Sequence, residues 1–155
     1  MSAATSTADT SSPGCLLRMT LQVYGNHKNK PEDNKAFSRE YLAKVAATHA
    51  RNSIEAYQQA FTPAPLRAAL DEMNRRGNRG RTVDDHDITV EFYFRRFADL
   101  ERVRKDPEFQ ALQAGEEPYV NLVHTVETLG WVEKYVDGGQ VVNVKDGRST
   151  YPPWG

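Results

Sequence analysis

The segment HDITVEFYF, His86–Phe94, alternates apolar and polar side chains along its length. The apolar side of the pattern consists of Ile88, Val90, Phe92 and Phe94. A period of two residues is that of a β-strand, whose successive side chains point to opposite faces of a sheet. The segment therefore predicts a strand with one face against a core, and with Asp87, Glu91 and Tyr93 on the other face.

Strands and helices alternate on both sides of this segment. Pro31, followed by two acidic residues, suits the start of a helix, and the Asp106-Pro107 pair suits a break between two helical pieces. The expected order is a strand in 15–24, a helix ending near His49, a strand in 53–61, a short helix in 62–77, a strand in 86–94, a broken helix in 97–115, and a long strand in 119–136 followed by a hairpin with 140–144.

This order predicts an α+β fold of the ferredoxin-like kind, β-α-β-β-α-β, with an antiparallel sheet and both main helices on one face. The other face would carry a mixture of polar and aromatic side chains, namely Thr20, Gln22, Tyr24, Asp87, Glu91 and Tyr93. A large one-sided surface of this kind is usually an interface. We therefore expect a homodimer in which two sheets face each other and enclose a barrel.

The composition limits the class of protein. A chain of 155 residues fits one domain, here expected over 15–145, with a disordered tail at 1–14 and a second tail at 146–155. A net charge of -1 argues against a nucleic-acid-binding protein, and the single cysteine suits a reducing compartment. No stretch is long enough for a membrane span, and the N-terminus lacks a secretory signal. A cytoplasmic location is the expectation.

His49 is the first candidate for chemistry. It shares one helical stripe with Phe37, Tyr41, Leu42 and Val45, and it lies close to the C-terminus of the helix. One interpretation is a packed, inert side chain. The other is a general acid or base at the mouth of the barrel, because imidazole titrates near neutrality and a helix C-terminus favours its cation.

The other candidates are weaker. Asp87 and Glu91 share one strand face and are either solvated acids or partners of His49 in proton transfer. His124, expected on the long strand, and His27, expected in a loop at the entrance, could contact a substrate, whereas His86 is expected to be structural. The histidines have no metal-ligand spacing, so neither a metal nor haem is selected. The basic segment 75–81 is expected to be a solvated loop rather than an RNA or phosphate site.

The stretch from Met19 to Asn143 resembles the EthD-like proteins of the dimeric α+β barrel superfamily, particularly the fungal branch associated with aromatic polyketide synthases. The resemblance rests on three segments in order, FSREYLAKVAATHARNSIEAYQQAFTP, DHDITVEFYFRRFADLERVRKDPEF and GWVEKYVDGGQVVN. Members of that group act without a cofactor as decarboxylases, dehydratases or cyclases on polyketide intermediates.

The resemblance implies a cofactor-independent lyase, a decarboxylase or dehydratase of secondary-metabolite biosynthesis, whose substrate is an aromatic polyketide. In this hypothesis His49 moves the proton, with Asp87 and Glu91 as acidic partners. The side chains expected to bind the substrate are Gln22, Tyr24, His27, Tyr93 and His124. The alternatives are a polyketide cyclase of the same fold and a non-catalytic dimeric barrel that binds a hydrophobic metabolite.

Overall fold

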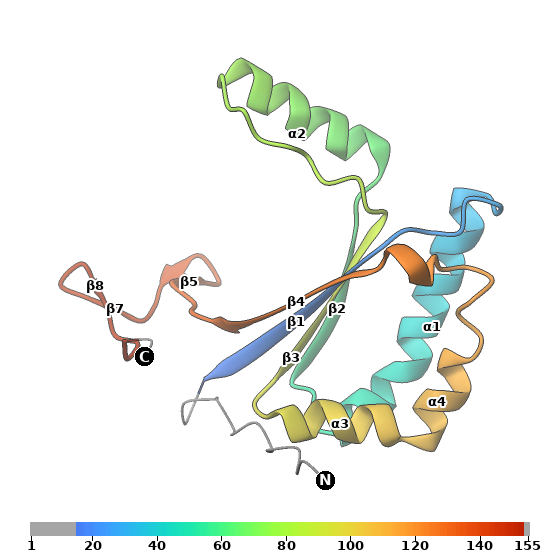
Figure 1. The fold of residues 1–155 in the computed structure, drawn as a ribbon. Coiled ribbons are helices and arrows are strands. Elements are labelled where there is room, and N and C mark those ends of the chain that lie inside the picture. Colours follow the sequence, from blue (N-terminus) through green and yellow to red (C-terminus); the bar gives the residue numbers. More distant parts are fainter. Residues whose placement is uncertain (1–14, 154–155) are drawn as a thin grey trace, which may run out of the picture.

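The computed structural model describes residues 15–153, and the predicted tail at 1–14 lies outside them. The main elements follow the predicted order (Figure 1). They are β1 Leu16–Val23, α1 Pro31–Arg51, β2 Ala56–Phe61, α2 Ala64–Arg76, β3 Ile88–Phe94, α3 Phe97–Lys105, α4 Pro107–Gln113 and β4 Val126–Val132. Two short hairpins end the chain, β5 Val136–Asp137 with β6 Gln140–Val141, and β7 Val144–Lys145 with β8 Arg148–Ser149.

The four main strands form one antiparallel sheet in the order β2-β3-β1-β4. The predicted ferredoxin-like α+β fold is therefore confirmed. The first and third strands occupy the centre of the sheet because each is apolar on one face: Leu17 pairs with Phe94, and Met19 with Phe92. Buried side chains from that face pack with Ile54, Leu100 and Val103 to form the core.

Helices α1, α3 and α4 cover one face of the sheet and leave the opposite face, the open face, without a helix (Figure 1). The open face carries Arg18, Thr20 and Gln22 of β1 beside Tyr93, Glu91 and Thr89 of β3, as the register requires. Most of this agrees with the predicted polar face. Thr20 is nevertheless only 6% exposed, because its hydroxyl lies against that of Thr128 on β4.

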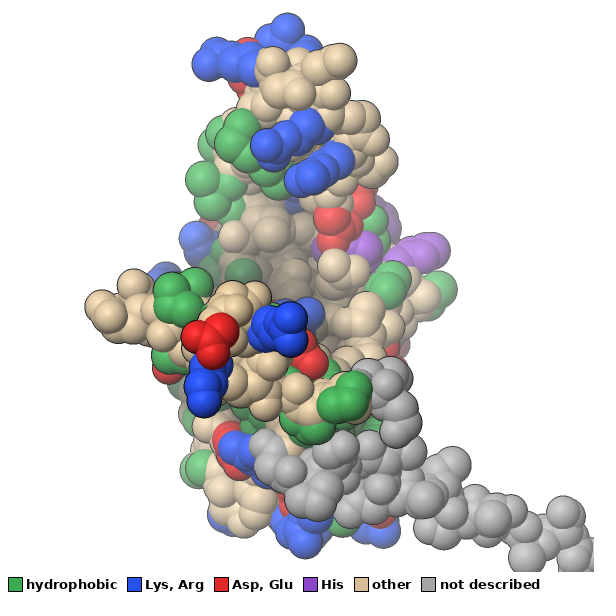
Figure 2. All heavy atoms as spheres, turned by 90° about the vertical axis from the view of Figure 1, so that its left-hand side faces the viewer, with side chains coloured by type: hydrophobic (Ala, Val, Ile, Leu, Met, Phe, Trp, Pro, Cys, Tyr) green, Lys and Arg blue, Asp and Glu red, His purple; other side chains and the backbone are tan. Residues whose placement is uncertain are grey.

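Helix α2 and the C-terminal hairpins project on the side of the open face, and Figure 2 shows the surface hollowed between them. The apolar side chains Leu66, Leu70 and Met73 of α2 are 62%, 44% and 55% exposed. Arg75 and Arg76 of the predicted basic loop lie in the last turn of this helix, where both pair with Glu72.

Two boundaries differ from the sequence-based prediction. The expected long strand at 119–136 is wrong in its first half, where a 3-10 turn, η1 Leu122–His124, precedes β4. Val120 keeps a single antiparallel bridge to Gly25. At 122–125 local bonds replace strand pairing, because the Asn121 side chain accepts the Val123 N–H and the Thr125 hydroxyl donates to the Asn121 carbonyl. The expected tail at 146–155 also begins inside the β7–β8 hairpin.

Within residues 15–153, no helix combines the length and the apolar character needed to cross a bilayer.

Candidate functional site

A cavity of about 490 Å³ lies between the helix-covered face of the sheet and helices α1 and α4; we call it the sheet–helix cavity. Its volume falls within the range of small-molecule sites, about 300–1,000 Å³. Its walls are mainly apolar and aromatic, formed by Leu21, Val23, Phe37, Leu42, Tyr57, Ile88, Val90, Phe92, Phe109, Val120 and Leu122. Such walls suit a flat aromatic ligand.

Polar groups converge on this cavity from helix α1 and from the turn after α4. Tyr41 of α1 is 9% exposed, and its hydroxyl is buried without a hydrogen bond of normal geometry. Burial, and next the Glu116 carboxyl, raise the pKa of Tyr41. Burial also raises the pKa of Glu116, and the nearby Tyr41 hydroxyl partly opposes that rise. The hydroxyl and the carboxyl are thus close enough to shift each other's pKa, although no hydrogen bond of normal geometry joins them.

His49 lies behind one wall of this cavity rather than at the mouth of a barrel. It is 1% exposed, and its ring centroid is 4.2 Å from that of Tyr57 and 5.4 Å from those of Phe92 and Phe109, three rings that line the cavity. Burial lowers the pKa of His49 to about 4, although Asp106 opposes the shift. Burial among aromatic rings therefore favours the neutral imidazole, whereas the position at a helix end had suggested the cation.

A second cavity, of about 790 Å³, lies at the end of the sheet where the β1–α1 loop meets the β2–α2 junction; we call it the loop cavity. It brings together four predicted residues, Tyr24, His27, Asp87 and His124. Ile88 lines both cavities, which therefore adjoin each other. His27, Asp87 and His124 are exposed, so their polar groups face solvent at low cost.

Four asparagines line the loop cavity, and the amides of three of them, Asn26, Asn29 and Asn34, hold the loop in place. Asn34 Nδ2 donates to the Asn26 carbonyl, and Asn29 Nδ2 donates to both Asn34 Oδ1 and the Pro118 carbonyl. Asn26 Nδ2 also donates to the Pro118 carbonyl. These amides join the β1–α1 loop to the segment before η1, so their first role is structural.

The structure does not bring the predicted catalytic residues together. The Asp87 carboxylate accepts the Gly25 N–H at 2.8 Å. Asp87 precedes Phe92, the β3 residue whose ring contacts His49, by five residues, and at about 3.3 Å per residue the two backbone positions are roughly 16 Å apart. The expectation that Asp87 orients His49 is therefore wrong. Glu91 and Tyr93 lie on the open face, where Glu91 accepts hydrogen bonds from Gln58 and Tyr93. Gln22 shares that face.

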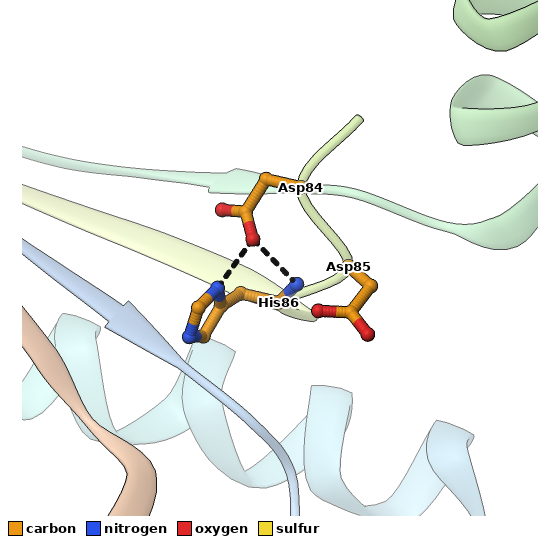
Figure 3. A group of neighbouring side chains, drawn as sticks. All are labelled: Asp84, Asp85 and His86. Carbon is orange, nitrogen blue, oxygen red and sulfur yellow. Dashed lines mark hydrogen bonds and ion pairs between the residues drawn. The ribbon is translucent and has the colours of Figure 1, made fainter. Parts of the chain in front are cut away.

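Asp84, Asp85 and His86 form a small cluster in the loop just before β3 (Figure 3). The Asp84 carboxylate accepts from both the backbone N–H and the Nδ1 of His86, and Asp85 accepts the Tyr24 hydroxyl at 2.5 Å. The His86 ring stacks on that of Tyr24. These bonds occupy the carboxylates, which agrees with the structural role expected for His86.

Glu116, Tyr41 and Tyr57 are the site residues that sequence analysis did not single out for chemistry. Tyr41 shares the predicted helical stripe with His49, but the spacing alone gives it no chemical role. Glu116 follows α4 in a turn with no periodic pattern, so no local signal distinguishes it from the neighbouring Glu117. Only the packing of this turn on α1 identifies it.

The fold has known relatives among solved structures. A dimeric ferredoxin-like protein of unknown function from Thermobifida fusca superposes with a TM-score of 0.54 at 15% identity, covering 77% of this chain and 92% of that one. A DABB-family protein with a ferredoxin-like fold from Mesorhizobium loti gives a TM-score of 0.51 at 14% identity, covering 75% and 95%. These similarities confirm the ferredoxin-like class.

The EthD domain model matches residues 27–122, more than half of the chain. The chain therefore belongs to the EthD family. It is 41% identical over 139 residues to a protein of Aspergillus terreus named "putative oxygenase", with 89% of this chain and 87% of the relative covered. It is 25% identical over 136 residues to the conidial pigment biosynthesis dehydratase EthD of Metarhizium robertsii, with 84% and 92% covered.

Proposed function

We propose that this protein is an enzyme that moves a proton on an aromatic polyketide intermediate without a cofactor, and that the reaction is a lyase reaction, dehydration or decarboxylation. The observation that carries the proposal is the sheet–helix cavity, whose aromatic walls suit a flat ring system and whose buried polar groups are proton donors and acceptors. Proton transfer next to a carbonyl needs such groups in a site that excludes water.

Dehydration is the first of these reactions to test, because a relative carries the name of a pigment biosynthesis dehydratase. Oxygenation is the second candidate, since the relative at 41% identity is named a putative oxygenase. Removing a proton beside a carbonyl produces an electron-rich enolate, from which a β-hydroxyl can leave or which molecular oxygen can oxidise. Both candidates therefore use the same first step.

His49 enters this proposal in a changed position. Its lowered pKa favours the neutral imidazole at neutral pH. The rings of Tyr57 and Phe92 lie between His49 and the cavity, so His49 packs behind them and contacts a substrate only if one of those rings moves. Asp87, Tyr24, His27 and His124 are proposed to line the approach through the loop cavity. Glu91, Gln22 and Tyr93 are proposed to face a second copy of the chain across the open face.

The homodimer is part of the proposal. Solved structures of the same fold are described as dimeric, from Thermobifida fusca and from Bacteroides fragilis. Two open faces packed together would enclose the polar side chains of β1 and β3 between sheets.

The experiment uses purified protein, a β-hydroxy ketone precursor of a polycyclic phenol, and the corresponding phenolic acid, with a chelator and no added cofactor. Mass spectrometry follows loss of water, loss of carbon dioxide and gain of oxygen, under argon and under air. Loss of water under argon supports dehydration, and products that form only under air support oxygenation. Tight binding without turnover under either atmosphere would leave the non-catalytic barrel as the better account.

A further inference from the structure

The sheet–helix cavity contains a carboxyl and a hydroxyl, those of Glu116 and Tyr41, that influence each other and have no further hydrogen-bond or ion-pair partner within residues 15–153. The Tyr41 hydroxyl is buried and makes no hydrogen bond of normal geometry. Glu116 is partly buried beside it and lines the same cavity, and its carboxylate forms no ion pair within residues 15–153. A buried polar group without a partner is costly, so such groups in a cavity point to a ligand.

The backbone fixes Glu116 in this position. Its N–H donates to the Gln113 carbonyl, and its own carbonyl accepts the N–H groups of Tyr119 and Val120. The Tyr119 ring in turn stacks on Phe37 of α1, with centroids 4.1 Å apart and planes 5° apart. Phe37 lies one helical turn before Tyr41, so one helix holds both the stack and the hydroxyl. The two groups therefore face the cavity from a rigid frame.

We propose that Glu116 is the proton acceptor in the sheet–helix cavity, that the Tyr41 hydroxyl donates a hydrogen bond to the carbonyl oxygen of the substrate, and that the ligand is a flat polycyclic ketone with an acidic C–H next to, or conjugated with, that carbonyl. The inference rests on the proposed function, because it assigns the proton step of that reaction to particular residues. It replaces His49 as the group that moves the proton.

The step balances with a single carboxylate. The Glu116 carboxylate takes the proton as the C–H bond breaks, and the electron pair forms an enolate whose oxygen accepts the Tyr41 O–H. If a β-hydroxyl is present, the enolate electrons form the C=C bond as the C–O bond breaks. The departing oxygen takes the proton from Glu116, which releases water and regenerates the carboxylate. Burial raises the pKa of Glu116, which makes its carboxylate a stronger base than an exposed one.

Anthrone is a suitable probe, because it is a flat tricyclic ketone with an exchangeable methylene and no leaving group. Under argon in deuterated buffer, the enzyme should accelerate deuterium uptake at this methylene above the buffer rate. Glu116→Gln should reduce the enzyme-dependent rate about a hundredfold or more, and Tyr41→Phe at least about tenfold. Anthrone affinity, measured by fluorescence, should be retained in Glu116→Gln. The rate should fall as pH drops through the raised pKa of Glu116.

Glu117→Gln is the matched control, with the same chemical change at the adjacent exposed residue, and it should leave exchange unchanged. Glu127→Gln tests the other carboxyl at this cavity. Exchange that survives Glu116→Gln, or that is lost in Glu127→Gln instead, overturns the inference, as does binding of anthrone without exchange by the unmodified protein. Exchange that needs Glu116, combined with no turnover of any polyketide substrate, would uphold the inference and reject the proposed lyase.

Discussion

Arg51 and Asp106 join the end of α1 to the start of α4 through a two-pronged ion pair, with Arg51 Nε 3.0 Å and Arg51 Nη2 2.8 Å from the two carboxylate oxygens. The same carboxylate accepts Asn52 Nδ2 at 2.9 Å and the backbone N–H groups of Glu108 and Phe109. Phe109 lines the sheet–helix cavity and touches His49. One carboxylate therefore positions the α4 wall of the candidate site.

Asp106→Ala should lower the melting temperature by a few degrees, roughly the shift expected when a helix cap is lost in a domain of this size. Hydrogen bonds from Asn52 and then from Arg51 hold the pKa of Asp106 below its usual range. Its stabilisation is therefore present at neutral pH and is lost as pH falls through that lowered pKa. Asp106→Asn retains an acceptor for the cap, so its melting temperature in thermal scans should lie between those of the unmodified protein and Asp106→Ala. Equal melting temperatures for all three proteins would contradict this role.

His49 gives the fold a second dependence on pH. The unfolded imidazole titrates near 6.5 and the folded one near 4, so the unfolded state binds the proton more readily between these values. The buried neutral imidazole therefore contributes its full share to the stability of the fold above about pH 6.5, and this contribution declines as pH falls toward 4. His49→Phe keeps a ring in place and removes the titration, so its melting temperature should vary less than that of the unmodified protein over this range.

Truncation at the same position should be costly. His49 is 1% exposed among three aromatic rings, so His49→Ala leaves an internal void, and about 3 kcal/mol of unfolding free energy should be lost in denaturant titrations. If His49 only supports the wall, His49→Phe should retain anthrone exchange. Loss of exchange in a folded His49→Phe protein with normal anthrone affinity would return the proton step to His49.

The two cavities can be distinguished by filling each from its rim. Gln113 lies at the end of α4 on the rim of the sheet–helix cavity, and His124 lies in η1 on the loop cavity; both are exposed, so a larger side chain meets little resistance. Gln113→Trp should weaken binding of a hydroxyanthraquinone at least about tenfold, or about 1.4 kcal/mol. His124→Trp should slow association more than it weakens binding. The reverse pattern in stopped-flow fluorescence would place the ligand in the loop cavity.

Dimer formation across the open face can be tested at Gly130. Gly130 pairs with Arg18 on this face, and a Cβ there would meet nothing within 4 Å in the protomer. Gly130→Lys should therefore fold normally but place like charges between the facing sheets, so light scattering should detect monomer at concentrations where the unmodified protein is a dimer. Ala111→Lys, on the exposed side of α4, is the control and should remain a dimer. A dimer unaffected by Gly130→Lys would place the interface elsewhere.

The sheet could be predicted from sequence because its signals are local. Alternation at His86–Phe94 and the proline that starts α1 each act within a few residues, and both gave the right element. The start of β4 could not be predicted in this way, because the side chain of Asn121 competes for backbone groups that a strand would have used. His49 shows a different limit: its stripe was correct, but its protonation depends on three rings contributed by other elements.

The candidate site was harder to predict than the fold for the same physical reason. Tyr24, His27, Asp87 and His124 do meet at one cavity, whereas Glu91 and His49 lie elsewhere. Glu116 carries no mark in the sequence that separates it from Glu117. Its distinguishing property, burial beside Tyr41, arises only when the turn after α4 packs on α1.

The position of the sheet–helix cavity couples substrate range to thermodynamic stability. The space lies between layers that would otherwise pack against each other, so a wider cavity for a larger substrate removes contacts from the core itself. The free energy of unfolding of a domain is only about 5–15 kcal/mol, and each added void lowers it. Lineages that acquire bulkier substrates should therefore carry compensating changes far from the cavity, and bound ligand should act as an internal scaffold that raises the melting temperature in proportion to its fit.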